Sequence, residues 1–71
     1  MNPLAYEVDI FPLSEADGGG FAAVAPELPG CRSDGDTPQE ALENIYDAIS
    51  CWIEAAQEMG RVVPHPRKLA A

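Results

Sequence analysis

The chain has 71 residues, of which twelve are acidic and four are lysine or arginine, so its formal net charge is −8 at pH 7. This length has room for one hydrophobic core, and we expect a single soluble domain over residues 1–71. The charge disfavours direct binding of nucleic acid or anionic membranes by this chain alone, and no apolar run approaches the roughly 18 residues of a membrane span.

A core of this size barely offsets the conformational entropy of folding, so small domains commonly depend on disulfides, a metal or self-association. Cys31 and Cys51 are isolated, and His65 is the only histidine, which leaves no ligand set at metal-binding spacing. With no apolar leader, the chain is predicted to be cytoplasmic, with two reduced, partly buried thiols. We expect no metal and no cofactor, and we expect a homo-oligomer.

The segment 5–13 alternates in polarity, which predicts a half-buried strand. One side of this strand would carry Tyr6, Val8 and Ile10, and the other side would carry Glu7, Asp9 and Phe11. Pro12 places the strand end near a sheet edge. A second apolar strand is predicted over residues 20–25, so the two segments form a hairpin across the loop 14–20.

The glycine run 18–20 in that loop has two interpretations. Glycine-rich loops can hold phosphate, but such loops open a helix whose N-terminus faces the anion. Here a strand follows the run and Asp17 precedes it. The pattern therefore favours a turn with positive φ angles over a phosphate site.

Turn residues dominate the next stretch, because Pro29 presets φ and Gly30 accepts a positive φ. Residues 31–33 leave room for a short third strand. The Asp34-Gly35-Asp36 sequence then predicts a second turn, which leads into a helix.

The helix has the clearest signals in the chain. Thr37 is an N-cap residue, Pro38 suits the first helical position, and Glu40 stands at the capping-box position. The helix should run to about Met59, with Gly60 as its C-terminal stop.

A last short strand is predicted at Val62 and Val63, followed by a stop at residues 64–66 and a small basic tail at Arg67 and Lys68. The predicted order is β-β-β-α-β. This is an α+β fold, with a small antiparallel sheet and one long helix packed on it.

One arc of the helix is apolar and should cover the sheet; it comprises Leu42, Ile45, Ile49, Trp52, Ile53, Ala56 and Met59. A helix of about 22 residues is longer than strands of five or six residues, so part of this face should extend past the sheet. Trp52 and Met59 are therefore predicted to need an outside partner. Together with Phe11 they are the candidate oligomer interface.

The opposite arc carries carboxylates only: Glu40, Glu43, Asp47, Glu54 and Glu58. The helix has no lysine or arginine, so two pairs of like charges stand four residues apart, where an ordinary exposed helix would mix signs. Two interpretations stay open, a solvated face and a docking surface for a basic protein. With Asp9 of the first strand, these acids are the candidate partner-binding residues.

Two catalytic hypotheses are weaker. A metal-dependent nuclease would need several carboxylates to converge, and the candidates are Asp9, Asp34, Asp36, Glu43 and Asp47. The helical acids among them should point away from Asp9. Nucleophilic catalysis by Cys31 or Cys51 would need His65 beside the sulfur, and no pattern places it there. We therefore expect no enzyme.

Several motifs, in order, resemble the HicB antitoxin family from Tyr6 to Pro66. They are Asp17-Gly18-Gly19-Gly20-Phe21 with Ala23, then Pro26-Glu27-Leu28-Pro29-Gly30-Cys31, then Gly35-Asp36-Thr37-Pro38 with Glu40-Ala41, then Asn44, Ala48, Ile49 and Trp52, and finally Gly60 and Val63-Pro64-His65-Pro66. The resemblance implies a degenerate RNase H-like fold that binds and masks a small basic HicA toxin, an mRNA-cleaving ribonuclease.

Many members of that family add a DNA-binding domain that represses their own operon, and the chain ends at Ala71 with nothing of that kind, so the sequence does not predict whether this chain takes part in autorepression. The leading hypothesis is a cytoplasmic antitoxin-type module that occludes a basic ribonuclease. The main alternative is an orphan homo-oligomeric scaffold of the same fold without a toxin, and the third is a weak metal-dependent nuclease.

Overall fold

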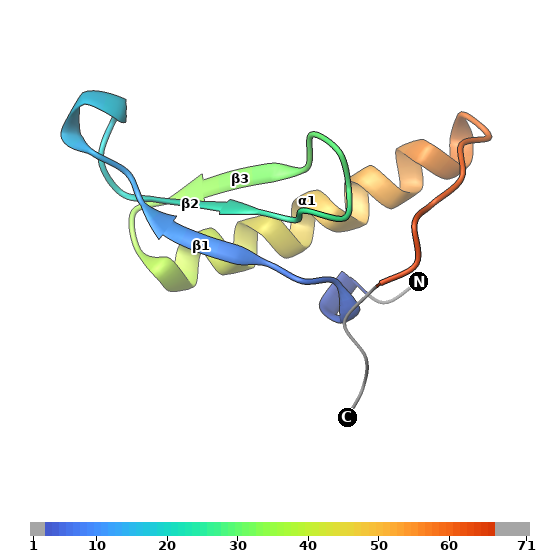
Figure 1. Ribbon diagram of the computed structural model, residues 1–71, viewed down its shortest axis with the longest axis horizontal. Helices are drawn as coiled ribbons and strands as arrows, with labels where there is room; N and C mark the ends of the chain where they lie inside the picture. The colour runs from blue at the N-terminus through green and yellow to red at the C-terminus, as the bar shows by residue number, and fades with distance from the viewer. Residues whose placement is uncertain (1–2, 67–71) are drawn as a thin grey trace.

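The structure is a computed structural model that describes residues 3–66. Its elements are η1 (Pro3–Ala5), β1 (Asp9–Pro12), η2 (Glu15–Asp17), β2 (Phe21–Val24), β3 (Arg32–Gly35) and α1 (Pro38–Glu58). The three strands form one antiparallel sheet in the order β1-β2-β3, and α1 crosses one face of it (Figure 1). The prediction of a small antiparallel sheet with one long helix is confirmed.

The first hairpin has the predicted strand order but shorter strands. β1 pairs with β2 so that Asp9 lies opposite Val24 and Pro12 opposite Phe21. The residues before β1 leave the ladder, because η1 occupies residues 3–5 and the chain bends at Tyr6, whose side chain is fully buried. The predicted strand over residues 5–13 is therefore too long at its N-terminal end.

The glycine loop is a turn, as predicted. Gly18, Gly19 and Gly20 have φ angles of 102°, 70° and 73°, which other residues adopt only with strain. Before them the chain forms the short 3-10 helix η2, in which the Ser14 side chain accepts a hydrogen bond from the Asp17 N–H. The sequence pattern did not predict this helix.

The third strand is displaced from its predicted place. It covers Arg32–Gly35 and not residues 31–33, so Asp34 and Gly35 are strand residues where a turn was predicted. A Cβ atom on Gly35 would lie 2.5 Å from the Ala41 nitrogen and 2.8 Å from the Glu40 carbonyl carbon. Gly35 is thus needed for the close approach of β3 to α1, a tertiary requirement that local turn propensity does not contain.

The helix begins and ends where the sequence predicts. The Thr37 hydroxyl accepts from the Glu40 N–H at 3.1 Å, while the Glu40 carboxylate accepts from the Asp36 N–H, one residue earlier than a standard capping box. At the other end Gly60 has a φ of 71°, and the Arg61 N–H donates to the Ala56 carbonyl at 2.8 Å. This is a Schellman C-cap.

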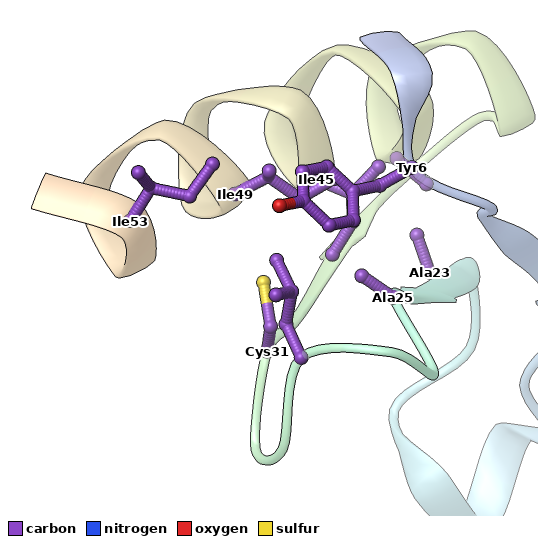
Figure 2. Packing of buried hydrophobic residues seen from close by; sticks show 9 residues of the cluster. Tyr6, Ala23, Ala25, Cys31, Ile45, Ile49 and Ile53 are labelled. Atoms are coloured by element: carbon purple, nitrogen blue, oxygen red, sulfur yellow. The ribbon is translucent and has the colours of Figure 1, made fainter. Parts of the chain in front are cut away.

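The core lies between α1 and the sheet, as Figure 2 shows. Ile45, Ile49 and Ile53 are buried against Tyr6 and against the strand-and-loop residues Ala23, Ala25, Leu28 and Cys31. Leu42 and Trp52 pack at its margin, which confirms most of the predicted apolar face. Met59 does not belong to it, since its side chain is 61% exposed beyond the last helical turn.

The C-terminal part of α1 extends past the strands (Figure 1), as the mismatch in length predicted. The chain covers much of this part itself. The indole Nε1–H of Trp52 donates to the Pro29 carbonyl at 2.9 Å, and the Tyr6 hydroxyl donates to the Pro64 carbonyl at 2.6 Å. Val63 also packs against the core. The loop after β2 and the segment after α1 thus continue the sheet side of the core over the end of α1.

The predicted fourth strand at Val62 and Val63 is wrong. Residues 61–66 have no strand structure, and Val62 is 88% exposed. Pro64 and Pro66 have no backbone N–H, so they have no donors for a ladder. The segment returns toward η1 (Figure 1), held by its bond to Tyr6. The predicted tail at Arg67 and Lys68 lies outside the described residues.

Candidate protein-binding surface

The outer face of α1 is acidic over its whole length. We call it the acidic helix face, and it comprises Glu40, Glu43, Asp47, Glu54 and Glu58. All five side chains are exposed, because the buried isoleucines of α1 hold the opposite side of the helix against the sheet. α1 contains no lysine or arginine, so these charges have no basic neighbour within the helix. The structure therefore brings the predicted helical acids together on one surface.

Near the C-terminal end of the acidic helix face the surface is hollowed. The hollow has a volume of about 220 Å³ and is lined by Cys51, Glu54, Ala55 and Glu58. Its lining combines the small side chains of Cys51 and Ala55 with two carboxylates. A lysine or arginine fits such a site, because its methylene stem contacts the small side chains while its charge meets the carboxylates.

The N-terminal end of the same face adjoins a second hollow of about 220 Å³. It forms where the glycine loop, the end of β3 and the start of α1 meet, and its lining comprises Gly18, Gly19, Asp34, Gly35, Asp36, Glu40 and Asn44. The Asn44 amide donates to the Asp34 carbonyl at 2.8 Å and fixes this corner. Asp36 lines this hollow beside Glu40 and thus adds a carboxylate at this end of the acidic helix face, which sequence spacing alone did not reveal.

Asp9 lies elsewhere. It is paired with Val24, and this register places both on the sheet face that α1 does not cover. We call this the open face, and its strand residues are Asp9, Phe11, Ala22, Val24, Arg32 and Asp34. Asp9 and the acidic helix face therefore lie on opposite sides of the two layers. One flat partner surface cannot contact both.

A third hollow, with a volume of about 690 Å³, borders the open face. Leu13, Asp17, Arg32, Ser33 and Asp34 line it. Arg32 is a basic side chain in an otherwise acidic setting, and sequence analysis did not select it. Only the strand register, which places it beside Asp34 on the open face, could have identified it.

The predicted oligomer residues are not one patch. Phe11 is 40% exposed on the open face, whereas Met59 lies at the far end of α1, beyond the strands. Trp52 is half-buried and already donates its N–H to Pro29 within the chain. Of the three, Phe11 and Met59 present free apolar surface.

The residues considered above for metal binding and nucleophilic catalysis can be placed in the structure. No group of three or more histidine, cysteine, aspartate or glutamate side chains in residues 3–66 is placed to hold a metal ion. Both cysteines are free, with Cys31 buried and Cys51 exposed, so the prediction that both are partly buried is wrong for Cys51. Burial raises the pKa of the Cys31 thiol, which keeps it protonated and unreactive.

A comparison with protein families gives one match. The model of the HicB-like antitoxin of bacterial toxin-antitoxin systems matches residues 6–71, nearly the whole chain. No solved structure matches the chain significantly. Among the described residues, no helix is both long and apolar enough to cross a bilayer.

Similar proteins occur in Synechocystis sp. and Thermoplasma acidophilum. Two UPF0150 proteins of Synechocystis sp. are 37% and 41% identical to this chain over 59 residues, which is 83% of this chain and 77% and 73% of the relatives. A UPF0150 protein of Thermoplasma acidophilum is 35% identical over 52 residues, covering 73% of this chain and 75% of the relative. The matched region is most of each of these relatives.

Proposed function

Because this chain belongs to the HicB-like antitoxin family of bacterial toxin-antitoxin systems, we propose that it is a protein-binding module that occludes a small, basic, HicA-like mRNA-cleaving ribonuclease. Family membership supports the antitoxin role, and the toxin's identity and the occlusion mechanism are the proposal. The observation that carries it is the acidic helix face. This surface is exposed, contains only carboxylates, and has no basic side chain in α1 to neutralise it.

Electrostatics explain why such a face suits this partner. A protein that binds RNA must present a basic surface to the phosphates, and an acidic face complementary to it competes for the same groups. Like charges four residues apart cost a few tenths of a kcal/mol per pair in the free protein. A basic partner removes this repulsion, so neutralisation of Glu43 with Asp47, and of Glu54 with Glu58, favours the complex.

The proposal is tested by charge reversal. The triple variant Glu43→Lys, Asp47→Lys, Glu54→Lys should weaken binding to the small basic protein encoded beside this chain by well over about tenfold at low salt. The loss should shrink at high salt, because exposed charges are screened. Isothermal titration calorimetry at two ionic strengths measures both effects.

A matched control distinguishes the effect of the acidic helix face on binding from the effect of net charge alone. The double variant Glu7→Lys, Glu15→Lys changes the net charge as much as Glu43→Lys, Asp47→Lys does, and its residues are exposed outside α1. The control should bind nearly as the unmodified protein does. The proposal for the acidic helix face would be contradicted if the Glu7/Glu15 and Glu43/Asp47 double variants lost equal affinity. It would also be contradicted if the triple variant bound with unchanged affinity.

An orphan homo-oligomeric scaffold is the second candidate, favoured by the exposed apolar side chains of β1 and the helix end. Ile10, Phe11 and Met59 are all exposed. This candidate predicts a stable oligomer and no basic protein in the adjacent reading frame. A pull-down from the native cell separates the two, since the antitoxin proposal requires a small basic protein in the eluate.

Two further points belong to the proposal. The order β-β-β-α is compatible with the degenerate RNase H-like fold that the family resemblance implies. The two free cysteines suit the reducing cytoplasm, where a toxin that cleaves mRNA would act.

A further inference from the structure

The two edges of the sheet differ. The Leu13 N–H donates to the Gly20 carbonyl in the same register as the β1–β2 ladder, so Asp9 and Phe11 also form hydrogen-bonded pairs with β2. By alternation, the backbone N–H and carbonyl of Ile10 point away from the sheet, as does the carbonyl of Pro12. β1 is thus an open edge with free main-chain groups.

The β3 edge is partly occupied. The Ala25 N–H donates to the Cys31 carbonyl in the β2–β3 register, which by the same alternation turns the main-chain groups of Asp34 outward. The Asp34 carbonyl accepts from the Asn44 side chain of α1 at 2.8 Å. Within residues 3–66 one outward acceptor of β3 is thus occupied and none of β1, which makes β1 the freer edge for another strand.

We propose that β1 pairs with β1 of a second copy, antiparallel about a two-fold axis at Ile10, giving a six-stranded sheet. In this register Ile10 lies opposite the partner's Ile10, and each donates its N–H to the other's carbonyl. The Val8 N–H meets the carbonyl of the partner's Pro12. This specifies the self-association in the proposed function and does not depend on toxin binding.

Charge favours this register over the alternative in which the pairing is shifted toward the N-terminus and Ile10 lies opposite the partner's Val8. With Ile10 opposite the partner's Ile10, Asp9 lies across from the partner's Phe11, and no like charges are directly opposed. Pairing Ile10 with the partner's Val8 instead would set Asp9 against the partner's Asp9, which is destabilising, and more so in a chain of net charge −8.

Hydrogen bonding disfavours the alternative register that is shifted toward the C-terminus. If Ile10 faced the partner's Pro12, the reciprocal bond would be missing, because proline has no N–H. In the proposed register Pro12 faces the partner's Val8, at the end of the pairing, where one missing donor matters least. Pro12 lacks a donor and so disfavours most pairings along this edge, but it is compatible with the one symmetric arrangement proposed here.

The pairing also covers apolar surface. Ile10 is 36% exposed and Phe11 is 40% exposed. The two Ile10 side chains would meet on the helix-bearing face, and the two Phe11 rings would stand diagonally, within reach of each other, on the open face. The edge is short, so the dimer should be in a concentration-dependent equilibrium with the monomer.

Sedimentation equilibrium of the full chain over a range of concentrations tests the proposal. Ile10→Pro removes the outward N–H and should raise the dimer dissociation constant by about tenfold or more, with circular dichroism confirming that the variant folds. Pro12→Ala supplies the missing donor and should lower that constant. Pro12→Ala keeps the proposal falsifiable if Ile10→Pro does not fold.

Phe11→Lys and Phe11→Glu test the register. Both lose the ring, but lysine faces the partner's Asp9 and glutamate repels it, so the lysine variant should dimerise more tightly, and less so at high salt. Gln57→Lys and Gln57→Glu, on the exposed part of α1, control for net charge. This comparison separates the proposed register from the one in which Ile10 faces the partner's Pro12. In that register position 11 faces the partner's position 11, and lysine and glutamate would be equally unfavourable.

The proposal is overturned if the unmodified protein stays monomeric at the highest concentrations, or if a folded Ile10→Pro variant dimerises as before. Toxin binding, measured separately by calorimetry, distinguishes the two proposals. A monomer that binds the basic protein would refute only strand pairing. A dimer with the predicted responses that binds no basic protein would refute only the antitoxin proposal.

Discussion

The indole Nε1–H of Trp52 donates to the backbone carbonyl of Pro29 at 2.9 Å and fastens the loop after β2 to the part of α1 that extends past the sheet. Trp52→Phe keeps an aromatic ring and removes the donor, so it should lower the free energy of unfolding by about 1 kcal/mol. Denaturant titration followed by circular dichroism measures the change. Tyr46→Phe is the control, since Tyr46 is half-buried on the same helix and should be nearly neutral.

Gly35 should be sensitive to substitution because β3 and α1 approach each other closely there. Gly35→Ala places a Cβ atom 2.5 Å from the Ala41 nitrogen, so β3 and α1 must separate, at a cost of about 3 kcal/mol. Gly30→Ala is the comparison, because Gly30 has a φ of 78° and open space around it. It should lose only about 1 kcal/mol, from backbone strain. Thermal unfolding of both variants measures these losses. A larger loss of stability in Gly30→Ala than in Gly35→Ala would contradict the close approach of β3 and α1.

The Tyr6 hydroxyl should make stability depend on pH. Burial first, and the nearby Glu27 carboxylate second, raise the pKa of Tyr6 above its usual value. Below about pH 10 the phenol is neutral in both folded and unfolded chains, and its contribution is fully present. As pH rises through the folded-state pKa, the unfolded chain releases the proton more readily, so stability falls.

Urea titrations between pH 8 and the alkaline limit of the folded protein would show this loss. Tyr6→Phe should reduce the slope above about pH 10 and, because the bond to the Pro64 carbonyl is gone, lower stability by about 1 kcal/mol at neutral pH. An unaltered alkaline slope in the variant would assign the pH dependence to another group.

The two thiols should differ in accessibility. Cys51 is exposed on α1 and should react with a thiol reagent in the folded protein, whereas Cys31 is only 6% exposed and should react after unfolding. Titration with Ellman's reagent, with and without denaturant, counts the two classes. Cys51→Ser should remove the thiol that reacts in the folded protein. If a rapidly reacting thiol remained in this variant, the loop around Cys31 would have to open readily.

The helix, the hairpin and the family could be predicted from the sequence because their signals are local. The cap at Thr37, the stop at Gly60 and the glycine run each fix backbone geometry over a few residues. The exposed acidic helix face also followed from helical periodicity alone, once the buried face was known.

Two predictions failed because they depend on tertiary contacts: the position of β3 and the strand predicted at Val62 and Val63. Gly35 looks like a turn residue, and only the proximity of α1 shows why a glycine ends β3 there. Val62 and Val63 have strand propensity, but the neighbouring prolines leave no ladder to join. The position of Asp9 on the open face, apart from the helical acids, required the strand register.

The side-chain bond from Asn44 to the Asp34 carbonyl has a consequence for how large an assembly of this chain can become. Growth of a sheet into a ribbon requires every copy to offer two open edges. Here the α1 side chain Asn44 occupies one main-chain acceptor on β3, so β3 is less suited to strand pairing than β1 is. Association through β1 alone joins two copies in a closed pair, whereas pairing through both edges would build an open ribbon.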